Sequence, residues 1–331
     1  LQRVRFDERG RLRELVAQAR ARREQSVTGN GHGLAMTAAS AGMSPLARIN
    51  NQLGGLEGIR SLKALDDSLA SDSSLQDFIG CLQDIHRAVT GMPPQLLAIA
   101  DEHAIDAVSR QALSAWGATA HPDSSGTPFS AEPVREARRE LWIANTQVNF
   151  CARAYPTVPV GHPDAAALTV LGGFMRNGFL HRSIREQGGA YGGGASQDSG
   201  IAAFRFYSYR DPRLLDTLAD FDRAIAWMLE SRHQDSALEE AVLGVIGSLD
   251  KPASPAGEAR QHFYQRLFGR SHEQREAFRR AILGVTLEDL RQVCDRYLDP
   301  ARASTAVVTS RKQQQALGSA VSELGLKIEV L

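Results

Sequence analysis

A short glycine-rich stretch at residues 181–195 contains the side chains best suited to chemistry. It holds Arg185 and, six residues later, Tyr191. Apolar residues recur every three or four positions before it, which predicts a helix that ends at Gly188–Gly189, because glycine readily adopts the left-handed conformation of a helix C-cap. A strand with apolar residues at 201–207 is predicted to follow. An arginine cation and a phenol held on such a corner would suit binding to a carbonyl group or an oxyanion.

Two other interpretations of this stretch are open from the residues alone. One is a plain helix–turn–strand corner in which the glycines serve only close packing. The other is a phosphate-binding loop, which the five glycines among residues 188–194 favour. No Lys–Ser/Thr pair follows these glycines, however, and they precede a strand instead of opening a helix. Both features weaken the phosphate interpretation.

The sequence around the two candidate residues resembles a known motif. The run Ile184–Gly194, Ile-Arg-Glu-Gln-Gly-Gly-Ala-Tyr-Gly-Gly-Gly, resembles the arginine/tyrosine motif of the presequence-protease branch of the pitrilysin family of zinc metallopeptidases. The flanking segments 171–181 and 204–212 resemble the same branch. In that family the motif lies in the C-terminal half of the enzyme, which is the part that this chain resembles.

The resemblance implies a role for each residue of the corner. Arg185 would orient the substrate or a neighbouring acidic group, and Tyr191 would donate a hydrogen bond to the scissile carbonyl. Two halves of such an enzyme close around an unfolded peptide, so the implied partners are an N-terminal catalytic half and an unfolded peptide substrate. A catalytically inert scaffold or a peptide-binding domain of the same fold is the alternative. The residues implied to contact the substrate are Gly188, Gly189 and Ala190.

The chain lacks the zinc motif of this family, His-x-x-Glu-His. Glu102–His103 has the second half of the motif, but Ile99 stands where the first histidine is required. His272–Glu273 begins a conventional His-Glu-x-x-His, but Glu276 replaces its second histidine. We therefore expect no metal and no cofactor in this chain, and zinc in the missing N-terminal half.

The composition argues against several classes of partner. The 331 residues have a formal net charge of zero, which gives no support to binding of nucleic acid or of an anionic membrane. No apolar run approaches the ~18–20 residues of a membrane span. The three cysteines are far apart and form no CxxC pair, which fits reduced thiols and a cytoplasmic location. The chain begins at Leu1 without a signal-peptide pattern, and we expect it to be a fragment of a longer protein.

The predicted elements divide the chain near residue 91. Residues 1–91 are predicted to be helical, and Pro93–Pro94 then prevent a helix from continuing. We predict that 1–91 is the helical remainder of an upstream (third) α+β domain and that 92–331 is a complete C-terminal (fourth) domain. The fold class is α+β: a two-layer sandwich of a mixed or antiparallel sheet and helices, of the pitrilysin type, preceded by the helical part-domain.

Local patterns make more detailed predictions. A long strand is predicted at 141–155, where polar and apolar residues alternate; the polar face is either solvated or, if the family resemblance holds, lines a substrate chamber. The first helix is predicted to end at 28–33, and Ser236 is predicted to open a helix with a capping box. Other predicted elements are a buried strand at 95–100, a helix at 104–116, a loop at 121–128, and strands at 306–309 and 327–330.

Overall fold

The computed structural model describes residues 4–92, 94–116 and 129–331, which fall into two compact units. Unit 1 lies within residues 1–18, 64–130 and 251–275. Unit 2 comprises residues 19–63, 131–250 and 276–331. The predicted domain boundary after residue 91 concerns a longer protein, and it stays a prediction.

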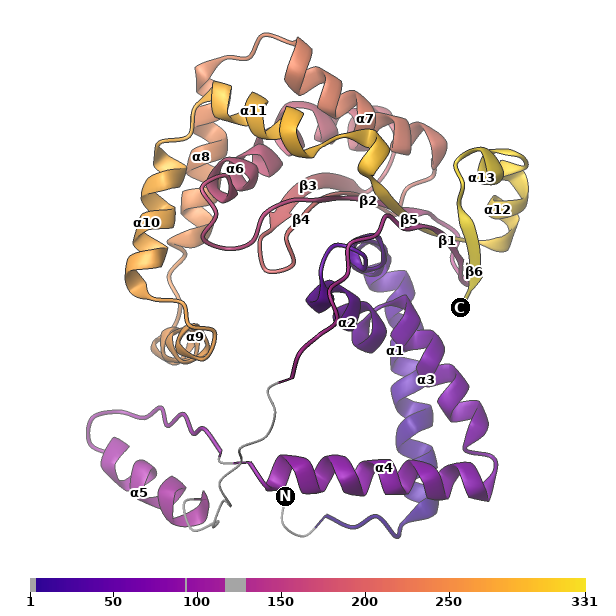
Figure 1. Cartoon of the computed structure of the whole chain (residues 1–331), viewed down its shortest axis with the longest axis vertical. Coiled ribbons are helices and arrows are strands. Elements are labelled where there is room, and N and C mark those ends of the chain that lie inside the picture. Colours follow the sequence, from indigo (N-terminus) through magenta and orange to yellow (C-terminus); the bar gives the residue numbers. More distant parts are fainter. Residues whose placement is uncertain (1–3, 93, 117–128) are drawn as a thin grey trace. The chain divides into compact units, whose positions relative to one another are not determined.

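Helices make up most of both units (Figure 1). Two of them are not α-helical: η1 (Arg176–Gln187) is a π-helix and η2 (Pro300–Arg302) is a 3₁₀-helix. The α-helices are α1 (Arg9–Ser40), α2 (Pro45–Gly54), α3 (Leu56–Ser68), α4 (Asp72–Thr90), α5 (Ile105–Trp116), α6 (Ala165–Met175), α7 (Leu215–Glu230), α8 (Asp235–Leu249), α9 (Pro255–Leu267), α10 (His272–Leu283), α11 (Leu287–Tyr297), α12 (Arg311–Leu317) and α13 (Ala320–Glu323).

The sheet of unit 2 is mixed and has six strands in the order β3-β4-β2-β5-β1-β6. β1 runs parallel to β5 and β6, whereas β2 is antiparallel to β4 and β5. β3 and β4 form an antiparallel hairpin in which Gly192 pairs with Tyr209. The strands are β1 (Arg139–Ile143), β2 (Phe150–Pro156), β3 (Gly192–Asp198), β4 (Ala203–Tyr209), β5 (Ser304–Thr309) and β6 (Lys327–Val330).

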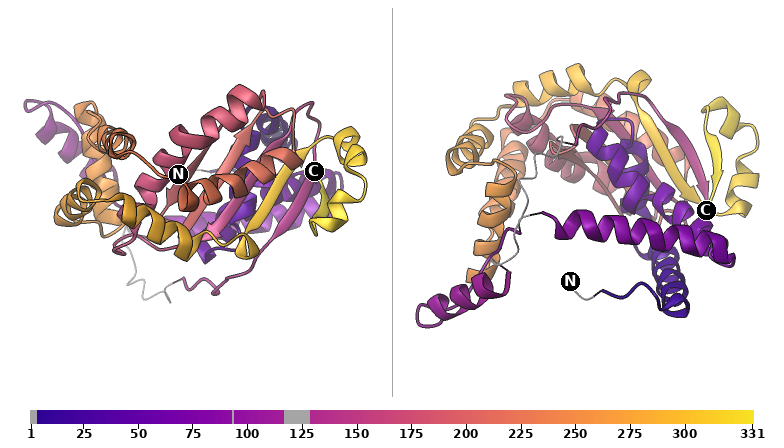
Figure 2. Two further views of the ribbon diagram at one scale, coloured as in Figure 1. Left: turned by 90° about the horizontal axis from the view of Figure 1, so that it is seen from above. Right: turned by 60° about the horizontal axis from the view of Figure 1, so that its bottom comes forward.

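Helices cover both faces of this sheet. On one face, Tyr155 and Phe206 share an apolar core with side chains of α6, η1, α7, α8 and α11, which lie together on that side of the sheet (Figures 1 and 2). On the other face, Trp142 and Phe150 share a second core with side chains of α1, α2 and α3, including Leu56. The predicted fold class is confirmed: helices and a mixed sheet form the layers, and a helical part precedes them. The N-terminal helices of unit 2 add cover to the second face.

The predicted strand at 141–155 is wrong as a single element. It is two strands, β1 and β2, which are separated in the sheet by β5. Because both faces of the sheet are covered, the polar residues of β2 are not solvated as expected. Arg153 is 8% exposed and pairs with Asp222, and Asn149, just before β2, is 1% exposed. Alternation of polar and apolar residues marked the pleat correctly, but it could not show that β5 would insert or that a second helical layer would cover the polar face.

Other local predictions also meet corrections. The segment 95–100 is not a strand, and Leu96, Leu97 and Ile99 are each 40% exposed. The helix expected to end at 28–33 continues as α1 with a kink at Asn30. No capping box forms at Ser236, because α8 begins one residue earlier with Gln234 as its N-cap. The predicted loop at 121–128 lies outside the described residues. The predictions for α5, β5 and β6 are confirmed.

Candidate functional site

The helix that leads into the glycine-rich stretch changes its form on the way. α6 is an α-helix that packs against β3 and α8 in the core of unit 2, and it continues directly into the π-helix η1. π-helical turns are rare and often lie at functional sites. In η1, Leu180 and Ile184 are fully buried, which anchors one side of the helix, whereas Arg185 on another side is exposed.

The corner after η1 is built by two glycines with different roles. Gly189 has a φ of +76°, which confirms the left-handed conformation predicted at the end of this helix. Two hydrogen bonds close the helix here, from Gly189 N–H to the Arg185 carbonyl and from Ala190 N–H to the Ile184 carbonyl, both 3.1 Å. Gly188 has a φ of −85° and needs no left-handed freedom. Instead, a side chain at position 188 would overlap with the guanidinium of Arg213.

Tyr191 follows the corner as an exposed aromatic residue, and 64% of it is accessible to solvent. Its ring lies edge-to-face against Tyr209, with 5.1 Å between the ring centroids. The guanidinium carbon of Arg210 is 5.9 Å from the centroids of both rings. The backbone N–H of Tyr191 donates to the Arg210 carbonyl at 3.4 Å. The Tyr191 ring is therefore supported from β4, while most of the residue stays open to a ligand.

Arg210 itself has an unusual backbone. Its φ is +50°, a left-handed conformation that costs a residue with a side chain of order 1 kcal/mol or more. Gly189 and Arg210 thus place left-handed residues on the two chain segments that flank Tyr191. Strained residues cluster at binding and catalytic sites, where the surrounding structure holds them in place.

Arg185 lies in the last turn of η1, as predicted, and its nearest polar partner is on the same helix. Its Nη1 atom is 3.3 Å from Nε2 of His181, and Nδ1 of the same ring is 3.4 Å from Glu186. No hydrogen bond joins Arg185 to Tyr191 in the part of the chain that the structure describes. The two candidate residues are both exposed on unit 2 but are held by separate partners, so a ligand would have to connect them.

One residue of this region was missed by the sequence analysis. His32, from α1, lies 4.8 Å from the ring of Tyr209 and 5.9 Å from that of Tyr207, measured between ring centroids. It extends the aromatic contacts of Tyr191 into a row that runs from Tyr191 through Tyr209 to His32. Burial lowers the pKa of His32, and its Nδ1 atom is buried without a hydrogen-bond partner. Nothing in the local sequence indicates this contact, because it joins residues about 175 positions apart.

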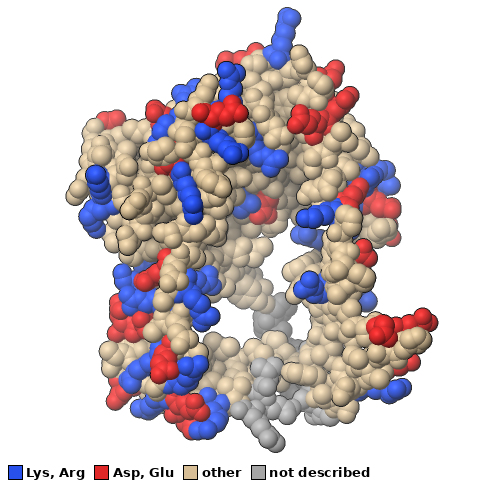
Figure 3. Space-filling model, turned by 180° about the vertical axis from the view of Figure 1, so that it is seen from behind, with Lys and Arg blue, Asp and Glu red and all other residues tan. Residues whose placement is uncertain are grey.

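The described residues offer no alternative chemistry of the kinds considered from the sequence. Among them, no group of three or more His, Cys, Asp and Glu side chains could hold a metal ion. None of the helices in the described ranges is long and apolar enough to cross a membrane. On the face displayed in Figure 3, basic and acidic side chains are interspersed. The glycines of the phosphate-loop interpretation lie at the corner and in β3, where they do not open a helix.

Comparison with known proteins identifies the same regions. Residues 139–311 match the family model described as the PreP C-terminal domain, and residues 1–65 match a model for a region associated with M16 peptidases of subfamily C. The mitochondrial presequence protease of Xenopus tropicalis is 30% identical over 320 residues, which cover 88% of this chain and 31% of that protein. The chain thus spans about three tenths of the length of the curated relatives that it matches.

Solved structures share the fold. A protease from Helicobacter pylori is 12% identical with a TM-score of 0.62, and the match covers 93% of this chain and 73% of that one. A peptidase M16 inactive domain from Pseudomonas fluorescens is 14% identical with a TM-score of 0.57, and the match covers 90% of this chain and 70% of that one. At these identities, the likeness shows the fold alone.

One expectation from the sequence is overturned by these comparisons. A cytoplasmic location was expected from the cysteines, but the relatives that match most of the chain are named as mitochondrial presequence proteases. Reduced thiols are compatible with more than one compartment, so cysteine usage alone could not distinguish them.

The family resemblance noted in the sequence is confirmed, since the family model for the C-terminal domain covers more than half of the chain and includes β1, the glycine corner and β5. The chain belongs to the presequence-protease family of pitrilysin-type metallopeptidases, and it corresponds to a C-terminal part of such a protein.

Proposed function

We propose that this chain is the C-terminal, non-zinc-binding portion of a zinc metalloendopeptidase that degrades unfolded peptides in a closed chamber. In this proposal, Arg185 and Tyr191 complete an active site formed with an N-terminal catalytic half. The observation that supports it most strongly is the exposed hydroxyl-bearing side chain of Tyr191, held on a rigid corner of a chain that belongs to this family.

Tyr191 is suited to donate a hydrogen bond to the carbonyl oxygen of a scissile peptide bond. A preorganised donor is most effective where negative charge develops, because it stabilises the oxyanion more than the starting carbonyl. The edge-to-face contact with Tyr209 and the hydrogen-bonded corner at Gly189 hold the phenol in place before a substrate binds. The supports of the ring come from unit 2 alone, so the position of Tyr191 within that unit needs no second chain.

Arg185 is suited to bind an oxygen of the substrate or an acidic group of the opposite half. Its guanidinium is exposed, and its polar contact among the described residues is with the ring of His181, so its charge is available to a ligand. The backbone of Gly188, Gly189 and Ala190 lies between the two side chains in the sequence and is proposed to contact the substrate. Zinc, when bound in the N-terminal half, would supply an activated water and a Lewis acid.

A complementation assay tests the proposal. The chain is incubated with zinc and a quenched fluorescent peptide, first alone and then with the N-terminal portion of its parent protein. We expect cleavage only in the combined sample, and we expect that cleavage to depend on Tyr191. Cleavage by the chain alone would contradict the proposal. Association of the two portions without any cleavage would favour the alternative, an inert scaffold or peptide-binding domain of the same fold.

A further inference from the structure

A hollow of ≈ 430 Å³ lies between η1 and α7 in unit 2, beside the glycine corner. Its volume falls in the range of small-ligand sites. Polar and charged side chains form one part of its lining and aromatic rings form another. The residues on which the argument depends are Phe179, Arg182, Arg213, Asp220, Arg223 and Trp227.

One buried carboxylate organises the charged part of the hollow. Only 2% of the Asp220 side chain is exposed, and it accepts hydrogen bonds from Arg213 at 3.0 Å, from Arg223 at 2.6 Å and from the hydroxyl of Ser183. Burial opposes ionisation of Asp220, but the hydrogen bonds from Ser183 and Arg223 and the charges of the two arginines outweigh it and lower the pKa. Asp220 is therefore an anion that fixes two guanidiniums at the wall of the hollow.

Positive charge remains in excess at this wall. Arg182 brings a third guanidinium, whereas Asp220 is the one carboxylate among the residues that line the hollow. The bonds from Arg223 to Asp220 use Nε and Nη2, so Nη1 is left to bind a ligand, and 57% of this side chain is exposed. Guanidinium groups bind carboxylates and phosphates through paired hydrogen bonds. The charged part of the hollow is thus complementary to an oxyanion.

The aromatic part of the hollow is fixed and apolar. The ring of Trp227 stacks on Phe174 with 5.5 Å between centroids, and it lies 5.8 Å from Phe179. Gly178 allows this close packing, because a side chain there would overlap with the indole. Trp227 therefore presents a rigid apolar surface beside the three guanidiniums, which an inorganic oxyanion would leave unused.

From these features we infer that the hollow binds the C-terminal carboxylate of a peptide whose last side chain is apolar. The last residue of a peptide places a carboxylate and a side chain on one carbon atom, which matches a hollow with guanidiniums and an indole on its walls. This inference rests on the proposed function in so far as it takes peptides as the ligands. It concerns residues other than Arg185 and Tyr191 and can be tested by binding alone.

Isothermal titration of the whole chain tests the inference. The probes are N-acetyl-Gly-Leu as the free acid, the same dipeptide as its C-terminal amide, N-acetyl-Gly-Gly as the free acid, and inorganic phosphate. We expect the leucine acid to bind at least about tenfold more tightly than its amide, because the amide loses charge-assisted hydrogen bonds. We expect it also to bind more tightly than the glycine acid and phosphate, because both lack the apolar side chain.

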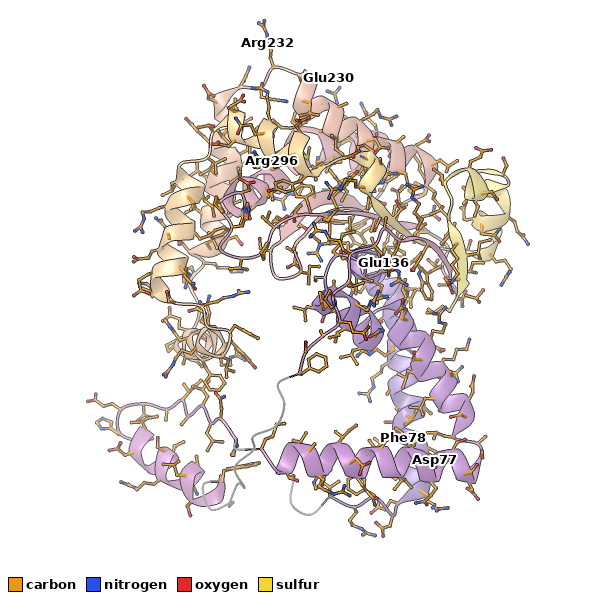
Figure 4. All side chains as sticks on the ribbon, in the orientation of Figure 1. Asp77, Phe78, Glu136, Glu230, Arg232 and Arg296 are labelled. Carbon is orange, nitrogen blue, oxygen red and sulfur yellow. The ribbon has the colours of Figure 1, made fainter. Side chains whose placement is uncertain are left out.

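Two variants assign the binding to the hollow. Arg182→Gln removes one guanidinium of the lining and should weaken binding of the leucine acid by about fivefold or more. Arg232→Gln is the matched control: it removes the same charge from an exposed residue just beyond α7, where the side chain extends away from the helix (Figure 4). Affinity in this control should match that of the unmodified chain, and circular dichroism should show that both variants are folded.

Several results would overturn the inference. These are equal affinities for acid and amide, phosphate binding as tight as that of the leucine acid, no binding of the acid up to about 10 mM, or equal effects of the two variants. Because no cleavage is measured, failure here would leave the complementation assay unaffected. Conversely, an inactive complemented enzyme would not prevent the carboxylate from binding to this chain.

Discussion

The guanidinium of Arg213 occupies the space that a side chain at Gly188 would need. A Cβ atom at position 188 would overlap with Nη2 of Arg213, and it would also lie 2.5 Å from the carbonyl oxygen of Ile184. The same Nη2 atom donates to the Ser183 carbonyl at 3.2 Å and to Asp220 at 3.0 Å. Gly188 is therefore required by a contact between the end of η1 and the segment before α7, and this contact fixes the helix from which Arg185 extends.

We predict that Gly188→Ala destabilises the chain by about 1–3 kcal/mol, because the new methyl group meets both a fixed guanidinium and a backbone oxygen. Chemical denaturation measures the difference. Gly244→Ala in α8 is the control, since nothing lies within 4 Å of a Cβ atom there. That change should stabilise the chain by about 0.5–1 kcal/mol, as expected for alanine in a helix. Equal stabilities of the unmodified chain and Gly188→Ala would show that the corner is looser than described.

Tyr191→Phe should lower kcat of the reconstituted enzyme by about 10²–10³-fold, because it removes one donor to the developing oxyanion. KM should change little, since the ring and its contact with Tyr209 are retained. Steady-state cleavage of a fluorescent peptide gives both constants. Tyr264→Phe, which alters an exposed tyrosine of α9, serves as the control and should leave them unchanged. A Tyr191→Phe enzyme with a normal kcat would remove Tyr191 from the active site.

The sequence predicted best where the determinants are local. The end of η1 was predicted from glycine at Gly188–Gly189, and Gly189 is indeed left-handed. The start of α11 was predicted from Thr286, whose side chain forms a capping box with Asp289. Both predictions depend on residues a few positions apart, whose hydrogen bonds are available to any chain that forms the helix.

Non-local contacts explain what the sequence could not predict. The insertion of β5 between β1 and β2 joins segments more than 150 residues apart, so the pattern at 141–155 gave no sign of it. The reason for Gly188 is Arg213, and the support of Tyr191 comes from β4 and, through Tyr209, from His32. The chemical types at the candidate site were therefore visible in the sequence, but the partners that hold them were not. The roles of Arg185 and Tyr191 stay predictions.

His32 should make stability depend on pH. Burial lowers its pKa in the folded chain, so below the ordinary histidine value of 6.5 the unfolded chain binds more protons than the folded chain. The free energy of unfolding should thus fall as pH decreases below 6.5, and this contribution should be fully present above it. Urea denaturation at several pH values measures the slope, which should be smaller in His32→Gln. Equal slopes in the two proteins would mean that His32 titrates normally.

The three cysteines should differ sharply in reactivity. Cys81 is exposed, whereas Cys151 and Cys294 are buried. Burial raises the pKa of the Cys151 thiol and raises that of Cys294 to about 12, so little thiolate is available at either. Iodoacetamide should therefore modify the native chain at Cys81 alone and the denatured chain at all three positions, as read by mass spectrometry. Rapid modification of Cys151 in the native chain would contradict the described core.

Asp220→Asn should destabilise unit 2 by roughly 1–3 kcal/mol, because the guanidiniums of Arg213 and Arg223 lose the anion that holds them. The effect should depend on pH in a defined direction. Since the pKa of Asp220 is lowered in the folded chain, its stabilising contribution is present above the ordinary aspartate value of 3.8 and is lost as pH falls through the folded value. The difference in unfolding free energy between the two proteins should therefore be constant near neutral pH and shrink only below about pH 4. Because Arg213 also contacts Gly188 and the Ser183 carbonyl, Asp220→Asn should in addition loosen the end of η1. Hydrogen exchange at the amides of Gly189 and Ala190 would detect this loosening, and unchanged exchange there would separate the Asp220 network from the candidate active site.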